Sequence, residues 1–184
     1  IFANRILFWG LMIGELGLVF YLSARIMRMS FAAAGLAFAA YAILNGLTLS
    51  FIFMAYTMES IATTFFVTAG TFGAMSIVGY TIKRDLGTLG RNLIMALIGV
   101  IIASVVNMFV HSSALQFVVS ILGVLIFTGL TAYDTQKIKW MVTQNNGLGE
   151  ETVMKLALLG SLTLYLDFIN LFLYLLRFLG NSRD

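Results

Sequence analysis

The sequence alternates between long apolar segments and short polar breaks. Six segments are apolar over roughly 20 residues or more, the length that a helix needs to cross the ~30 Å hydrocarbon core of a bilayer. They cover residues 4–26, 31–56, 61–82, 91–110, 114–139 and 153–179. No break is a Ser- or Pro-rich linker. The pattern predicts an all-α integral membrane protein with six transmembrane helices in a single bundle domain over residues 1–184.

The composition agrees with lipid as the main solvent. Only 10% of the residues are charged and 60% are hydrophobic, whereas soluble domains carry about 25% charged residues. Cysteine is absent and His111 is the only histidine. Disulfides, thiolate metal sites, Cys nucleophiles and multi-His metal sites are therefore excluded. Proline is absent as well, so any helix kink has to come from Gly or from polar side chains.

Positive charge is distributed unequally between the breaks. If the helices alternate in direction, eight basic residues share one side of the membrane: Arg25, Arg28, Lys83, Arg84, Arg91, Lys137, Lys139 and Lys155. Three lie on the other side: Arg5, Arg177 and Arg183. Basic loops face the cytoplasm, so we expect the first group to be cytoplasmic. This places residue 1 outside, and we expect one further helix upstream, which would make seven in the full protein.

Acidic residues inside the apolar segments are costly, at ~2.5–3.5 kcal/mol each on insertion scales, and each needs a reason. Glu15 lies midway along the first segment, Asp134 on the fifth and Asp167 near the middle of the sixth. The sixth segment also carries a polar stripe within one ~80° arc of a helix, formed by Gly160, Thr163, Asp167, Asn170, Tyr174 and Arg177. A polar stripe faces protein or water rather than lipid, so we expect the last helix to be central.

The same residues also have a purely structural interpretation, in which they pair with neighbours and fix helix packing. Asp167 and Arg177 would be ~15 Å apart along a helix, so Asp167 needs a partner on another helix, and we favour a functional role for it. For Asp134, near a membrane edge, both interpretations stay open. Arg177 is expected to extend to the interface. Glu15 would either line a pore or be held in its neutral form by burial.

Small residues recur at helical spacing and predict close helix packing. One strip is on the first segment and one on the third: Gly10, Gly14 and Gly17, then Gly70, Gly73, Ser76 and Gly79.

Three motifs resemble the transmembrane Bax inhibitor motif (TMBIM) family, most closely its bacterial members. Residues 128–139, TGLTAYDTQKIK, are similar to the motif of its penultimate helix. Residues 162–172, LTLYLDFINLF, followed by Leu-Leu-Arg177, are similar to its last helix. Residues 81–86, TIKRDL, resemble a cytoplasmic turn of bacterial members. The resemblance implies seven helices with the last one central, and a proton-sensitive calcium leak across the bacterial inner membrane.

The resemblance also implies roles for individual residues. Asp134 and Asp167 match the paired aspartates of the family's proton sensor. The arginine that latches this pair corresponds to Arg25, with Arg28 as the alternative. Two further positions match pore or gate residues of the family: Glu15, which matches an acidic pore position of some members, and Arg177, which matches a basic residue of the last helix.

The chemistry of such a pair is simple. Two carboxylates within hydrogen-bonding reach cannot both ionise cheaply, so they share a proton, and a nearby Arg would fix their geometry. Asp134 and Asp167 are 33 positions apart, further than expected for this motif pair, and a shift of register would separate them. Calcium prefers oxygen ligands, so these two carboxylates are also the candidate calcium contacts. The expected partners are the bilayer and the transported calcium ion, with no other cofactor and no nucleic acid.

Two other functions remain as alternatives. An intramembrane aspartyl protease also uses two aspartates, one in a Tyr-Asp pair such as Tyr133–Asp134, but Asp167 lacks the Gly-x-Gly context of the second. A Ser/His enzyme is disfavoured because His111 lies in a turn. We therefore expect no enzymatic activity. A membrane protein that modulates a protease or another complex, with no flux of its own, stays open.

Overall fold

The computed structural model describes residues 5–144, 147 and 149–181, so Arg183 lies outside the described residues. The described residues form helices without strands. Their order is α1 (Arg5–Arg25), the 3₁₀ helix η1 (Ile26–Arg28), α2 (Phe31–Leu49), the short α3 (Ile52–Ala55), α4 (Met58–Thr81), α5 (Gly87–Val110), α6 (Ser113–Gln144) and α7 (Glu150–Leu179).

The long helices match the six predicted segments. Within the described residues, α2 with α3, α4, α5, α6 and α7 are each long and apolar enough to cross a membrane. The 21 residues of α1 extend over roughly 31 Å at 1.5 Å per residue. The prediction of an all-α membrane protein is confirmed.

The second predicted segment is interrupted near its end. Ser50 ends α2, and its hydroxyl donates a hydrogen bond to the Leu47 carbonyl at 2.6 Å. The backbone then continues through one irregular step into α3. Such bonds from a side chain to the preceding turn are frequent where helices bend, and this break occurs in a chain without proline.

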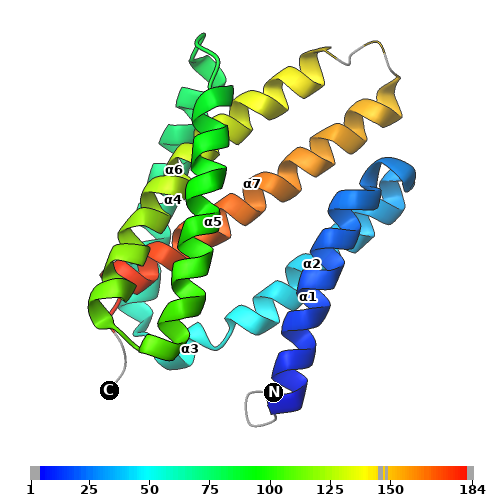
Figure 1. Cartoon of the computed structure of the whole chain (residues 1–184). Coiled ribbons are helices and arrows are strands. Elements are labelled where there is room, and N and C mark those ends of the chain that lie inside the picture. Colours follow the sequence, from blue (N-terminus) through cyan, green and yellow to red (C-terminus); the bar gives the residue numbers. More distant parts are fainter. Residues whose placement is uncertain (1–4, 145–146, 148, 182–184) are drawn as a thin grey trace.

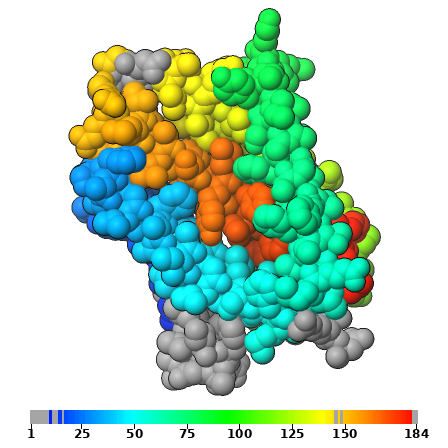
Figure 2. Space-filling view, turned by 180° about the vertical axis from the view of Figure 1, so that it is seen from behind, coloured from blue at the N-terminus to red at the C-terminus, as the bar shows by residue number. Residues whose placement is uncertain are grey.

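The centre of the bundle is the antiparallel pair α6 and α7. Helix α7 packs against α6, α4, α2 and η1, whereas α6 packs against α7, α5 and α4. Figure 1 shows α4 and α5 on one flank of this pair and α1 with α2 on the other. In Figure 2, the space-filling surface of α7 is visible between α2 and α4. The last helix is central as predicted, and α6 shares that position with it.

The connections rich in basic residues lie at the same end of the bundle. Figure 1 places η1, the α4–α5 turn and the α6–α7 turn together at the top, with the α2–α4 and α5–α6 connections at the opposite end. We call these the basic end and the outer end. The arrangement agrees with the alternation of helix direction on which the charge argument rests.

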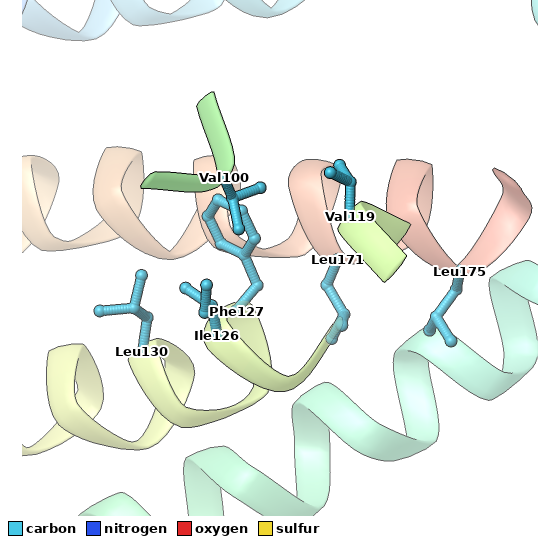
Figure 3. Close-up of a cluster of buried hydrophobic side chains, with 7 residues drawn as sticks. All are labelled: Val100, Val119, Ile126, Phe127, Leu130, Leu171 and Leu175. Carbon is cyan, nitrogen blue, oxygen red and sulfur yellow. The ribbon is translucent and has the colours of Figure 1, made fainter. Parts of the chain in front are cut away.

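A cluster of buried apolar side chains holds α5, α6 and α7 together. Its members are shown in Figure 3: Val100 of α5, Val119, Ile126, Phe127 and Leu130 of α6, and Leu171 and Leu175 of α7. Most other large apolar residues of α5 point outward, among them Ile98 at 54% and Phe109 at 81% exposed. This outward face suits contact with lipid tails rather than with water.

Five glycines within helices give close helix contacts, and only one belongs to the predicted strips. A Cβ at Gly79 would collide with the Ala132 backbone, and Gly90, Gly123, Gly129 and Gly160 each lie directly against a side chain of a neighbouring helix. The other strip glycines, Gly10, Gly14, Gly17, Gly70 and Gly73, have open space where a Cβ would be. The packing prediction was therefore wrong for these five within the described chain, because helical spacing alone does not tell which face meets a neighbour.

Candidate functional site

Asp134 of α6 and Asp167 of α7 meet in the interface between the two central helices. Both side chains are buried, with 8% and 4% of their surface exposed. Their carboxyl groups lie within hydrogen-bonding reach of each other. Asp167 Oδ2 is buried and has no hydrogen-bond partner within the described chain. The two aspartates predicted from the motifs are therefore in contact, despite the 33 positions between them.

The polar stripe of α7 explains why the two side chains face each other. Gly160 lies against Ile138 of α6, near the basic end, and Tyr174 lies against Gly123 of α6, nearer the outer end. Asp167 lies midway between these two contacts on the same face. Because each contact pairs a large side chain with a glycine, the helices approach closely and the stripe is directed at α6.

Neighbouring hydroxyl groups do not supply protons to the pair. On α6, Thr131 Oγ1 donates to the Phe127 carbonyl and Thr135 Oγ1 donates to the Thr131 carbonyl, both at 2.7 Å. On α7, Thr163 Oγ1 donates to the Leu159 carbonyl at 3.1 Å. A hydroxyl has one hydrogen to donate. A carboxylate only accepts hydrogen bonds, so a direct hydrogen bond between the two aspartates would require a proton on one of them.

Among the described residues, Lys137 is a basic group that acts on Asp134. It lies on α6 within one turn of Asp134 and attracts the Asp134 carboxylate. Its side chain is exposed, and the ammonium group is 5.8 Å from the centre of the Tyr133 ring. The positive charge of this exposed lysine at the basic end therefore interacts with the buried Asp134 carboxyl group.

The predicted latch residues are placed differently. Arg25 and Arg28 are both exposed, and the Arg25 guanidinium lies 5.9 Å from the centre of the Tyr21 ring. Within the described residues, neither arginine forms an ion pair or hydrogen bond with Asp134 or Asp167. Arg25 directly precedes η1 and Arg28 is its last residue, however, and η1 packs against α7. The latch role stays a prediction.

Gln136 is a residue of this region that the sequence analysis did not single out. It is 2% exposed and lies two positions after Asp134. Its Oε1 accepts a hydrogen bond from the Leu86 amide, and its Nε2 donates to the Arg84 carbonyl, each at 2.9 Å. Gln136 thus fixes the α4–α5 turn to α6. The sequence contained one signal for this contact. The motif TIKRDL, which contains Arg84 and Leu86, and the segment AYDTQK, which contains Gln136, both lie at the basic end.

Glu15 belongs to a separate polar group between α1, α2 and α7. It is partly exposed, but its Oε1 atom is buried beside the Thr48 hydroxyl, with Tyr41 and Tyr165 nearby. Neither Glu15 Oε1 nor Thr48 Oγ1 has a hydrogen-bond partner within the described chain. The structure therefore does not bring Glu15 together with the aspartate pair.

Arg177 lies at the outer end of α7, away from the pair. It is exposed, and its guanidinium is 5.7 Å from the centre of the Tyr174 ring. This place agrees with the predicted extension toward the interface.

The acidic groups do not form a storage site for a metal ion. Within the described residues, no cluster of three or more His, Asp or Glu side chains could hold one. Calcium takes 6–8 oxygen ligands, so two carboxylates would contact it only together with water or backbone oxygens.

The fold and the buried pair define a class: a multi-pass α-helical membrane protein with two acidic residues in contact between its central helices. The family model described as "Inhibitor of apoptosis-promoting Bax1" matches residues 1–184. The chain belongs to this family, as the motifs suggested.

Individual relatives agree with this assignment. The inner membrane protein YbhL of Escherichia coli K12 is 54% identical over 183 residues, which cover 100% of this chain and 78% of the relative. An uncharacterized protein of Borreliella burgdorferi is 52% identical over 186 residues, with 100% and 79% covered. An uncharacterized membrane protein of Streptococcus pyogenes is 43% identical over 177 residues, with 96% and 75% covered. The prediction of a multi-pass protein of the bacterial inner membrane is confirmed.

Proposed function

We propose that this protein is a pH-sensitive calcium leak channel in which the Asp134–Asp167 pair senses protons. The observation that carries this proposal is the contact between two buried carboxyl groups in the interface of the two central helices. Charge at this position is expensive in a bilayer. A change in the protonation of the pair therefore alters the energy of the α6–α7 contact directly.

Each central helix offers a route by which such a change reaches the rest of the bundle. Helix α7 packs against η1 and α2, so a shift of α7 would move the segment that carries Arg25 and Arg28. Helix α6 is hydrogen-bonded to the α4–α5 turn through Gln136, so a shift of α6 would move this turn. We assign Arg25, or Arg28 in its place, the role of holding the pair in the closed state.

Acid would weaken this closed state. A pair with one shared proton carries a negative charge that attracts the basic groups near it, and a second proton removes the charge. The hold of Arg25 and Lys137 on the pair then decreases, and the leak rises as the cytoplasmic pH falls. Moving a gate from mostly closed to mostly open takes only a few kcal/mol, which is within the range of a buried charge interaction.

The ion path would use the acidic side chains that the bundle contains. Asp167 and Glu15 offer carboxylate oxygens on α7 and α1, and Thr48 adds a buried hydroxyl oxygen beside Glu15. Carboxylate and hydroxyl oxygens along a hydrated path favour the entry of a hard divalent cation. Arg177 would act at the outer end of the same helix as Asp167.

The test is calcium flux into vesicles that contain only this protein and a trapped calcium dye. We expect flux above that of protein-free vesicles, rising as both faces are acidified. The absence of protein-dependent flux at every pH would overturn the channel and favour the alternative of a membrane interaction protein. Flux without pH dependence would overturn the sensor.

A further inference from the structure

Two adjoining cavities lie at the outer end of the bundle, where the end of α5, the start of α6 and the end of α7 come together (Figure 1). The larger has a volume of about 510 Å³ and the smaller about 260 Å³. Arg177 and Gln116 line both of them. The cavities are therefore two parts of one hollow around the Arg177 side chain, and we call this hollow the Arg177 cavity.

The lining of the Arg177 cavity has a single sign of charge. Arg177 is the only charged residue among the described residues that line it, and the other polar groups are amides and hydroxyls. Within the described part of the chain, no carboxylate forms an ion pair with the guanidinium. A guanidinium offers five N–H donors in a planar fork that matches an oxyanion such as phosphate. The cavity thus offers an anion a cation that none of the described residues neutralises.

The amide side chains of Asn107 and Gln116 add hydrogen-bond donors to the cavity. Asn107 Oδ1 already accepts a hydrogen bond from the Ser112 amide at 2.9 Å. This bond fixes the amide plane, so that the Asn107 Nδ2 donor is the group left for a ligand. Gln116, on the first turn of α6, lines both parts of the cavity with a second amide. Ser104 and Ser120 donate their hydroxyl hydrogens to backbone carbonyls. The donors left for an anion among the described lining residues are Arg177, the two amides and the hydroxyls of Ser113 and Tyr174.

The mouth of the cavity is apolar and faces the lipid. Ile101, Val105 and Met108 of α5 line the larger part and are 52%, 50% and 63% exposed. A small free anion gains nothing from such a surface. An amphiphile gains from both parts, because its anionic group can reach Arg177 while its acyl chain lies along α5.

We propose that the Arg177 cavity binds the phosphate of a phospholipid from the membrane leaflet at the outer end, held by Arg177, Asn107 and Gln116. Basic pockets between transmembrane helices bind lipid head groups in this manner on the opposite side of membranes. A guanidinium binds a phosphate more strongly than diffuse attraction to the membrane surface would, because its hydrogen bonds to the phosphate oxygens are charge-assisted and directional. The inference does not depend on calcium flux.

The test is native mass spectrometry of the purified protein, delipidated in a neutral detergent and titrated with phosphatidylglycerol. The wild type should retain one tightly bound lipid, and Arg177→Gln should weaken this first binding step about tenfold, as the loss of one charge-assisted pair implies. Arg177→Lys, which keeps the charge without the fork, should fall between the two. The matched control is Arg91→Gln, which removes an exposed arginine at the basic end and should leave the first step unchanged.

The other outcomes contradict the proposal. Equal loss in the Arg91 and Arg177 variants would mean that lipid binds only through non-specific surface charge. Displacement of the lipid by millimolar inorganic phosphate would mean that the cavity recognises a free anion instead. Helix content and elution volume of the Arg177→Gln protein check that it is folded. Should that variant not fold, Gln116→Ala provides a second test of the same cavity, with a several-fold weaker first step expected.

Discussion

Asp134 and Asp167 lie in contact although 33 positions separate them. The extra length between them is taken up by helix, because α6 continues to Gln144 and α7 already begins at Glu150. The longer connection therefore does not change the register in which the two carboxyl groups meet. The contacts of Gly160 with Ile138 and of Gly123 with Tyr174 fix that register on either side of the pair.

Replacing Gln136 by alanine should loosen the α4–α5 turn from α6. The change removes the hydrogen bonds to Leu86 and Arg84 and leaves the buried Leu86 amide without its partner, which costs about 1–3 kcal/mol. Thermal unfolding in detergent should show a midpoint lowered by several degrees. Gln144→Ala, at an exposed position on the same helix, is the control and should have almost no effect. Equal midpoints for the two variants would show that Gln136 does not fix the turn.

Two glycines of α4 should respond in opposite ways to alanine. A methyl group at Gly79 would collide with the Ala132 backbone, so α4 and α6 must separate, at a cost of about 1–3 kcal/mol. At Gly73 no described atom lies near the added methyl group, and alanine favours a helix over glycine by about 1 kcal/mol. Unfolding midpoints should therefore fall for Gly79→Ala and stay equal or rise for Gly73→Ala. The reverse order would contradict the helix contact.

The absence of cysteine allows the orientation to be tested by single-cysteine labelling. Arg84→Cys, in the exposed α4–α5 turn, should react with a membrane-impermeant maleimide only after the cells are permeabilised. Glu59→Cys, exposed near the start of α4 at the outer end, should react in cells whose outer membrane alone has been opened. Labelling of Arg84→Cys from outside would reverse the orientation inferred from the basic turns.

Hydropathy predicted the membrane-embedded part of each helix but not its full length. The prediction ended the fifth segment at residue 139, whereas α6 extends to Gln144, because a helix can continue into water where its residues are polar. Helix α7 begins three residues early, at Glu150, where two acidic residues lie in its first turn and Lys155 pairs with Glu151 at 3.0 Å. Both features stabilise a helix start in water and carry no hydropathy signal.

The site was predictable as far as its motifs reached. Asp134 and Asp167 lie within two motifs of about a dozen residues, and the stripe on α7 indicated which face of that helix meets protein. The first helix offered no comparable motif, so the choice of Arg25 rested on its place in the chain alone. Which glycines form contacts was not predictable either, since Gly73 and Gly79 share one strip and only the position of α6 distinguishes them.

The pH dependence of calcium flux in single-aspartate variants tests the central claim most directly. Vesicles with wild-type protein, Asp134→Asn, Asp167→Asn or the surface control Glu59→Gln would be compared across pH. An amide in place of either carboxyl group leaves one titratable group with no second carboxyl group to share its proton. Both variants should therefore lose most of the rise in flux on acidification, whereas Glu59→Gln should keep it. The double variant should be no flatter than the single ones, because the two carboxyl groups act as one unit. If both single variants are folded and retain the full response of the wild type, the pair is not the sensor.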